Sequence, residues 1–211
     1  MRDYDGKTAT ERVAERRARL VDAGIELFGE LGYAGTSIRA VLRRAGLRDR
    51  YFGESFADLD ALLAAVYDQL IEEEVSECRA AIDATAGGSQ GARAMIDSLS
   101  RGLDGNPGHA RIKLREVFSG GPMVAVQRQE GLRKLARLVA DLLPAVQGVD
   151  DRRRLLLGVG VVSAADAYLL AWLDGELGVT RDDVVDLVTQ VFDSVATGMA
   201  VAAGRVAGAR Q

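Results

Sequence analysis

The stretch TSIRAVLRRAGLRDRYFGESF, residues 36–56, decides the fold that the sequence predicts. Its pattern is that of two short helices joined by a tight turn, in which Gly46 is free to adopt a positive φ. Phe52 and Phe56 are the next apolar anchors, so residues 48–51 are left on the outer side of the second helix. A major groove about 12 Å wide admits one such helix, and the stretch therefore predicts a DNA-binding helix-turn-helix.

The charge of the chain is unevenly distributed. The net charge is −4, yet residues 1–56 carry 11 Lys and Arg against 9 Asp and Glu, whereas the rest of the chain carries 16 against 22. Residues 36–56 alone hold five arginines and two acids. Because salt screens charges beyond roughly 10 Å, a local basic patch is enough to attract DNA phosphates. A solvated charged face is the alternative interpretation of these arginines.

A longer helix is predicted before this stretch. Thr8 and Glu11 have the spacing of a capping box, in which each side chain accepts a hydrogen bond from the other residue's backbone amide. The helix then runs for about 22 residues and ends at Gly32. Its expected apolar face consists of Val13, Leu20, Ala23, Gly24, Leu27, Phe28 and Leu31.

The second helix is expected to begin at Thr36, which is a good N-cap residue. Exposed amides at a helix start also suit a phosphate oxygen. Ile38, Val41 and Leu42 are expected to face inward, and Arg39 to lie on the outer side. These three helices complete a small DNA-binding domain.

Residues 27–68 resemble the N-terminal domain of TetR-family transcriptional regulators. The resemblance is carried by Leu27, Phe28, Gly32, Tyr33, Thr36, Val41, Ala45, Gly46, Leu47, Phe52, Phe56, Leu62 and Leu63. It implies an all-α fold with a three-helix DNA-binding domain at residues 1–56 and a larger helical effector-binding and dimerisation domain at residues 57–211. Residues 1–7 are expected to be disordered.

The resemblance also implies which residues contact DNA. The candidates are Thr36, Ser37, Arg39, Arg48, Asp49, Arg50, Tyr51 and Ser55. Thr36 and Ser37 match positions that hold phosphates, and Arg48 is suited to a longer phosphate contact. The other positions often meet bases, except that Ser55 replaces a frequent histidine or tyrosine.

One departure from the family concerns Gly53, which stands where the family nearly always has a tyrosine that touches the DNA backbone. A glycine inside a helix costs roughly 0.5–1 kcal/mol. The substitution also removes a phosphate contact. The sequence therefore leaves open a second function, a helical protein-interaction or ligand-binding module with weakened DNA binding.

The rest of the chain favours helices, because it is poor in aromatic residues and prolines. Expected helices start at Asp58, at residue 91 and after Asn106, and a further one spans residues 123–143. The single cysteine, Cys78, cannot form an internal disulfide, so it is expected to be a small buried residue. With a polar N-terminus unlike a signal peptide, these features predict a cytoplasmic protein.

The last two helices predict a dimer. Residues 155–173 are almost wholly apolar, but Asp166 near the middle disfavours a membrane span. A helix that is apolar all round must bury both faces. The final helix, capped by Thr180 and Asp183, carries a valine-rich stripe: Val184, Val188, Val191, Val195 and Met199. We therefore predict a homodimer through residues of about 152–176 and 181–203, whose four helices form a bundle on DNA with two-fold symmetry.

The resemblance further implies an effector pocket in the larger domain. Its candidate lining is Met95, Leu99, Phe118, Met123, Tyr168 and Trp172. This apolar set suggests a hydrophobic or aromatic effector, whose binding would release the protein from a palindromic operator. Repression is the family default. One histidine, His109, is too few ligands for a metal site, and no catalytic constellation or cofactor motif is present, so an enzyme is not expected.

Overall fold

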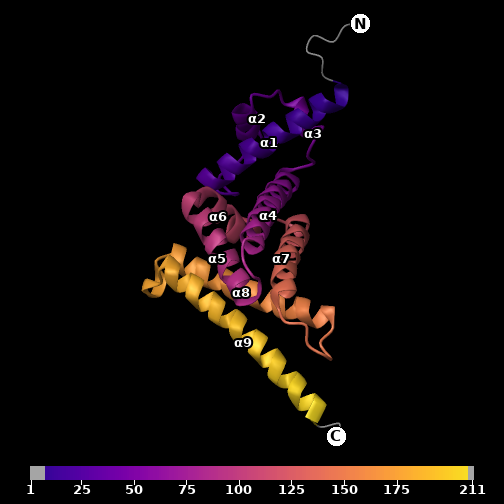
Figure 1. The fold of residues 1–211 in the computed structure, drawn as a ribbon. Helices are drawn as coiled ribbons and strands as arrows, with labels where there is room; N and C mark the ends of the chain where they lie inside the picture. The colour runs from indigo at the N-terminus through magenta and orange to yellow at the C-terminus, as the bar shows by residue number, and fades with distance from the viewer. Residues whose placement is uncertain (1–7, 209–211) are drawn as a thin grey trace. The chain divides into compact units, whose positions relative to one another are not determined.

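The computed structural model describes residues 8–208, and this described part is helical with no strand (Figure 1). The all-α expectation is confirmed. The expected disorder of residues 1–7 lies outside the described residues. The elements are α1 (Ala9–Leu31), α2 (Ile38–Ala45), α3 (Arg50–Gly53), α4 (Leu59–Asp83), α5 (Gly88–Gly105), α6 (Pro107–Leu114), η1 (Glu116–Phe118), α7 (Pro122–Leu142), α8 (Asp151–Leu173), η2 (Glu176–Gly178) and α9 (Arg181–Gly208).

The chain divides into two compact units. The first unit comprises Met1–Leu70 and Asn106–Arg128, and the second comprises Ile71–Gly105 and Gln129–Gln211. The division therefore falls inside α4 and inside α7. The unit that holds the helix-turn-helix is larger than residues 1–56, because it also contains the start of α4, all of α6 and the start of α7.

Helix α1 begins at the predicted capping box. The Glu11 amide donates to Thr8 Oγ1 at 3.2 Å, and the Thr8 amide donates to Glu11 Oε2 at 2.6 Å. The helix ends at Gly32, whose φ of 76° is easily adopted only by glycine. Val13 and Leu31 are exposed rather than inward, because the apolar pattern of α1 is longer than its buried stretch between Leu20 and Phe28.

Helix α6 packs against α1 within the first unit. The contact is close because Gly29 and Gly108 meet backbone to backbone, so that a β-carbon on Gly29 would lie 3.0 Å from the Gly108 Cα. Arg111 donates to the carbonyls of Gly29 and Glu30 at 3.5 and 3.1 Å, near the C-terminal end of α1. An element from the middle of the sequence thus completes the N-terminal unit.

The second unit is built around α5, α8 and α9, and Figure 1 shows α9 as its longest straight element. Leu169 and Phe192 lie in its core. Gly158 packs so tightly on α7 that a β-carbon there would lie 2.3 Å from the Ala136 carbonyl oxygen. Cys78 is fully buried, as expected, with Sγ 3.9 Å from the Met95 carbonyl oxygen.

Candidate functional site

Helix α2 begins one residue later than the sequence predicts. Its N-cap is Ser37, whose hydroxyl accepts a hydrogen bond from the Ala40 amide at 3.2 Å. Thr36 is buried instead, and its hydroxyl donates to the Gly32 carbonyl at 2.8 Å. The capping role expected for Thr36 was therefore wrong, because the turn after α1 folds this residue inward. Ser37 is the exposed hydroxyl at the start of α2.

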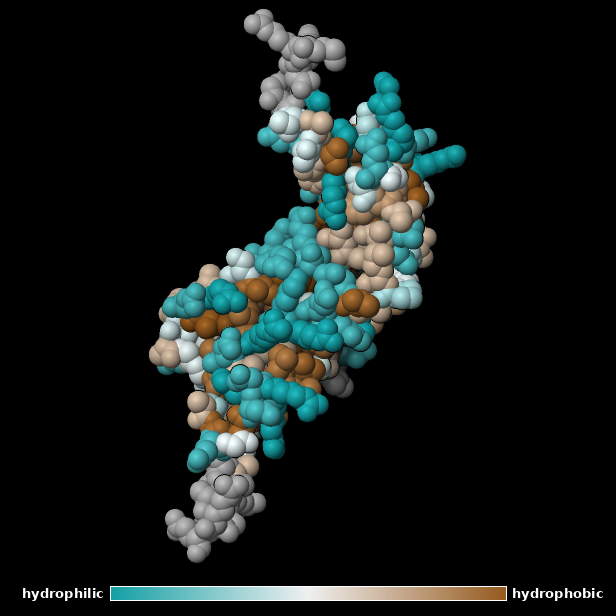
Figure 2. All heavy atoms as spheres, turned by 90° about the vertical axis from the view of Figure 1, so that its right-hand side faces the viewer, coloured by the Kyte–Doolittle hydropathy of each residue, from teal (hydrophilic) through white to brown (hydrophobic). Residues whose placement is uncertain are grey.

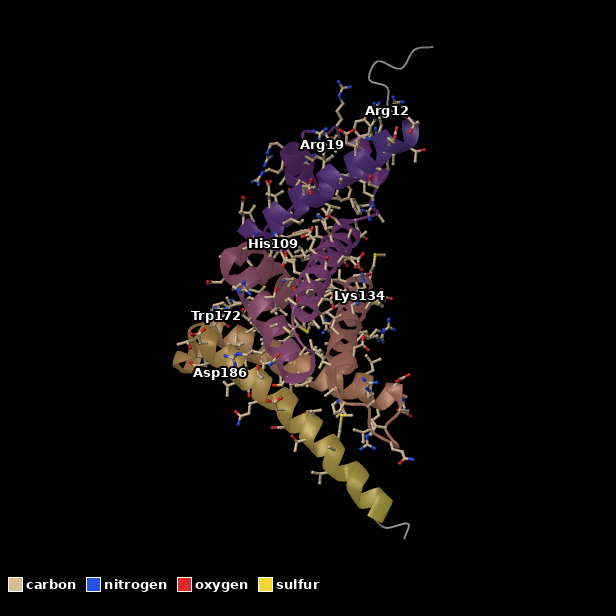
Figure 3. The ribbon with its side chains drawn as sticks, in the orientation of Figure 1. Arg12, Arg19, His109, Lys134, Trp172 and Asp186 are labelled. Carbon is tan, nitrogen blue, oxygen red and sulfur yellow. The ribbon has the colours of Figure 1, made fainter. Side chains whose placement is uncertain are left out.

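The turn between α2 and α3 has the predicted geometry. Gly46 takes φ 63° and ψ 37°, and the Leu47 amide donates to the Leu42 carbonyl at 2.9 Å. Arg19 of α1 donates to the carbonyls of Ala45 and Gly46, and Figure 3 places its side chain beside α2. A guanidinium at the C-terminal end of a helix satisfies carbonyls that lack a helical partner. Arg19 thus stabilises the turn.

The short helix α3 presents the predicted outer surface. Arg48, Asp49 and Arg50 are exposed, whereas Tyr51 and Ser55 are half-buried. On the inner side the buried rings of Phe52 and Phe56 have their centroids 5.9 Å apart. These two anchors fix which face of this segment points to solvent, and residues 48–50 lie on the exposed side. Ile38 of α2, expected to face inward, is 36% exposed.

Arg50 and Tyr51 are joined to each other. Arg50 Nη2 donates to the Tyr51 hydroxyl at 2.6 Å, and its guanidinium carbon lies 4.6 Å from the centre of the Tyr51 ring. The hydrogen bond lowers the pKa of the Tyr51 phenol and raises the pKa of the Arg50 guanidinium. Arg50 therefore keeps a full positive charge on the exposed surface of α3.

The arginines of the basic patch are not equivalent. Arg44 is held by Glu26 at 2.6 Å and by Glu30 at 3.0 Å. Its hydrogen bond lowers the pKa of Glu30, so its charge is largely neutralised by α1. Arg39 and Arg43 are exposed, and among the described residues no ion pair holds them. The exposed cations of this surface are these two side chains together with Arg48 and Arg50.

Gly53 lies on the exposed side of α3. No atom lies within 4 Å of the place that a β-carbon on Gly53 would take. Its φ is not in the positive region, so its conformation does not require glycine. The absence of a side chain here removes a possible backbone contact without a packing reason.

An apolar pocket with a cavity volume of about 30 Å³ lies inside the second unit. It is lined by Ala92, Met95, Ile96, Leu99, Leu135, Val139, Val161, Val162, Ala165, Asp166, Val188 and Phe192. The structure thus brings together two of the expected lining residues, Met95 and Leu99, with apolar side chains from α7, α8 and α9. The carboxylate of Asp166 is the one charged group of this lining.

The other four expected residues lie elsewhere. Phe118 and Met123 belong to the first unit and are 64% and 56% exposed, since the helix predicted to carry Phe118 ends at Leu114. Tyr168 and Trp172 are half-buried on α8 but do not line the pocket. The apolar pocket that the structure contains is lined by residues of four helices, which periodicity within single helices could not reveal.

Helices α8 and α9 leave a face uncovered. Both are long and apolar enough to cross a membrane by length and composition, and only 28% of each apolar window is buried within the chain. On α8 the exposed positions Leu156, Gly160, Ser163 and Ala167 recur every three or four residues. In Figure 2 brown, apolar atoms reach the surface beside the grey C-terminal residues. Gly160 and Gly198 face open space, where a β-carbon would meet no atom within 4 Å.

The valine stripe of α9 behaves differently from the expectation. Val184, Val188 and Met199 are buried within the chain, and Val191 and Val195 are half-buried. The exposed side of α9 is formed by smaller residues, Ser194, Thr197, Gly198 and Val201. The stripe therefore holds α9 to its own unit, and the small residues stay exposed.

Comparisons with known proteins agree with this arrangement. Residues 20–66 match the family model of bacterial regulatory proteins of the tetR family. The HTH-type transcriptional activator FasR of Mycolicibacterium smegmatis is 24% identical over 176 residues, covering 83% of this chain and 80% of the relative.

Solved structures share the fold. FadR of Bacillus subtilis in complex with stearoyl-CoA is 17% identical with a TM-score of 0.68, over 86% of this chain and 98% of that one. The multidrug binding protein EbrR complexed with imidazole is 21% identical with a TM-score of 0.67, over 83% and 94% of the two chains.

An exposed helix-turn-helix on one unit and an apolar pocket inside another define a ligand-responsive DNA-binding regulator of transcription. Residues 20–66 carry the N-terminal domain of bacterial regulatory proteins of the tetR family, as the resemblance of residues 27–68 predicts.

Proposed function

We propose that the protein binds a palindromic DNA operator as a homodimer and is released by a small apolar effector. The observation that carries the proposal is the exposed surface of α2, α3 and the turn between them, which presents Arg39, Arg43, Arg48 and Arg50. The DNA-contacting set that we propose is the predicted one without Thr36, whose hydroxyl is already bonded inside the unit.

The proposed DNA-contacting residues divide into those that contact bases and those that contact phosphates. Arg39, Asp49, Arg50 and Tyr51 meet base edges, because the first residues of a helix in the major groove are the ones that reach them. Ser37, Arg48 and Ser55 contact phosphates, with the amides at the start of α2 adding donors. Such contacts make binding strongly dependent on salt.

Dimerisation is proposed through the uncovered faces of α8 and α9. Small residues such as Gly160 and Gly198 allow helix axes to approach closely, and Leu156 and Val201 add apolar area. A two-fold axis through these faces makes a four-helix bundle. This arrangement buries the apolar surface of both helices in protein rather than in a lipid bilayer, where Asp166 would be costly. It fits a protein that works in the cytoplasm.

The effector is proposed to occupy the apolar pocket of the second unit. Its lining suits a hydrocarbon or aromatic group, and stearoyl-CoA and imidazole are the ligands named for two proteins of the same fold. An effector releases DNA only if it binds the DNA-incompetent state more tightly. A coupling of about 1–3 kcal/mol changes operator affinity roughly 5- to 150-fold.

The test is fluorescence anisotropy with the DNA that flanks the gene, titrated with salt. A steep loss of affinity over about 50–200 mM salt supports the proposal. Absence of binding at the lower salt concentration contradicts it and favours the second candidate, an interaction module of the same fold in which Gly53 has weakened DNA binding.

The direction of regulation has its own test. We propose repression, because a dimer bound over a promoter excludes RNA polymerase. In vitro transcription from the bound promoter should fall when the protein is added and recover with the effector. A rise in transcript instead would make this protein an activator, the activity named for FasR.

A further inference from the structure

Arg16 of α1 contacts α3 at two points. Its guanidinium carbon lies 4.6 Å from the centre of the Tyr51 ring, and its Nη2 lies 3.2 Å from Glu54 Oε2. Tyr51 and Glu54 are three residues apart, which places them on one side of a helical turn. The Arg16 side chain is only 22% exposed, although it is charged. A single side chain outside the helix-turn-helix therefore spans the length of α3.

The Tyr51 ring is also held by a second cation. Arg50 lies 4.6 Å from the ring centre and donates to the phenol oxygen at 2.6 Å. A cation is attracted to the electron-rich face of an aromatic ring. Two guanidiniums on one ring leave Tyr51 half-buried rather than free in solvent. Because Arg50 is bonded to the same phenol, the orientation of Arg50 follows that of Tyr51.

Helix α3 needs such support because its own sequence supplies little. It has four residues, its N-cap Asp49 makes no side-chain cap, and Gly53 is one of the four. Glycine loses more conformational freedom on folding than any other residue. Phe52 and Phe56 anchor its inner side, but they leave the outer side chains free to rotate.

We propose that Arg16 is a positioning residue for DNA recognition. Its contacts with Tyr51 and Glu54 fix the outer face of α3, and so set operator specificity. The inference rests on the proposed DNA binding. Arg16 acts through Tyr51 and Arg50, which contact the bases. Its simultaneous contacts with Tyr51 and Glu54 require the planar guanidinium rather than a positive charge alone.

The experiment compares Arg16→Ala and Arg16→Lys with the full-length protein, measuring anisotropy on operator DNA and on a scrambled duplex. A positioning role predicts that Arg16→Ala lowers the ratio of operator to scrambled affinity by roughly tenfold. The slope of affinity against salt should stay unchanged, because no phosphate contact is lost. Arg16→Lys should recover little of the ratio of operator to scrambled affinity, since an ammonium cannot contact both Tyr51 and Glu54 in the same way.

A direct phosphate contact predicts the opposite pattern. Both duplexes would then weaken equally, the salt slope would fall by about one, and Arg16→Lys would restore binding. That result would overturn the inference. Arg79→Ala is the matched control, because it removes an exposed arginine of α4 in the second unit and should change neither quantity.

A readout without DNA separates this inference from the proposed function. In ¹³C-tyrosine NMR of the full-length protein, assigned with Tyr51→Phe, the Tyr51 phenol should titrate at a higher pH in Arg16→Ala than in the wild type. The hydrogen bond from Arg50 is the largest cause that lowers the pKa of Tyr51, and the charge of Arg16 lowers this pKa further. An unchanged Tyr51 titration contradicts the contact between Arg16 and Tyr51. A wild-type protein that binds no DNA but shows the titration difference contradicts the proposed function, and with it the role in operator recognition, while the contact stands.

Discussion

The hydroxyl of Tyr33 donates a hydrogen bond to Asp60 Oδ1, which joins the turn after α1 to the first turn of α4. The other carboxylate oxygen of Asp60 accepts the Gly121 amide at 2.9 Å. One carboxylate thus ties three segments of the first unit together. This bond raises the pKa of Tyr33 to about 12, because deprotonation would place a phenolate beside Asp60.

The first prediction concerns this pKa. The folded pKa of Tyr33 is raised above its unfolded value, so its contribution to stability is complete below about pH 10 and is lost as the pH rises through about 12. Phenolate absorbance should show a late step that Tyr33→Phe removes. In Asp60→Asn that step should move toward about pH 10. If the titration step does not move in Asp60→Asn, other charges cause the raised pKa of Tyr33.

The second prediction concerns Arg50. If Arg50 contacts a base, Arg50→Ala should cost about 1–3 kcal/mol on the operator and relax the preference at one base pair. Binding to a library of single-base operator variants measures both effects. Equal weakening on every sequence would make Arg50 a phosphate contact instead. Arg44→Ala is the control, because Glu26 and Glu30 already neutralise that charge.

The third prediction concerns Gly53, where the structure leaves room for a side chain. Gly53→Ala should raise the free energy of unfolding by roughly 0.5–1 kcal/mol, measured by urea denaturation. Gly53→Tyr should in addition strengthen binding to operator and scrambled DNA alike, by roughly tenfold, if the ring hydroxyl reaches a phosphate. No gain in affinity with a retained fold would show that the position faces away from the DNA.

The fourth prediction tests the dimer. Gly160→Arg adds a large charged side chain at an open position of α8, so the monomer should fold while the dimer dissociates. Analytical ultracentrifugation should show half the mass, with helical circular dichroism unchanged. Gly105→Arg at the end of α5 is the matched control, since it also faces open space. A Gly160→Arg protein that remains dimeric would place the interface elsewhere.

The fifth prediction tests the pocket. Ala165 is buried in its lining, so Ala165→Phe should fill the cavity at a cost of roughly 1–3 kcal/mol in stability. The variant should keep its operator affinity but lose the thermal stabilisation by long-chain acyl-CoA or another apolar ligand that stabilises the wild type. Tyr168→Ala, outside the lining, should retain that stabilisation. If both variants respond equally to the ligand, the effector binds outside this pocket.

Much of the fold could be predicted because its signals are local. A capping box spans four residues, an amphipathic face repeats every three or four, and a positive φ belongs to one glycine. Thr8, Gly46, Phe52 and Asp58 accordingly have the roles that the sequence indicates, with Asp58 Oδ1 accepting the Ala61 amide at 2.8 Å. The N-cap role predicted for Thr36 was wrong for a similarly local reason. Two adjacent hydroxyl residues compete for one N-cap position, and the sequence does not indicate which of them turns inward.

The roles of the long charged side chains could not be predicted in the same way. An arginine reaches well beyond its own helical turn, so its role depends on which distant segment meets it. Arg44 meets α1 and is neutralised, Arg19 caps a turn, and Arg111 joins α6 to the end of α1. The apolar pocket likewise takes its lining from four helices.

By itself, the sequence determined the all-α fold, the helix-turn-helix and the exposed residues 48–50, since these follow from contacts between near neighbours in the chain. Only the tertiary structure decided which arginines of the basic patch are held in ion pairs by α1. It also decided that α6 belongs to the same unit as α1, and which apolar side chains enclose a pocket. The physical reason is that these properties arise from packing between residues far apart in the sequence, where periodicity carries no information about the partner.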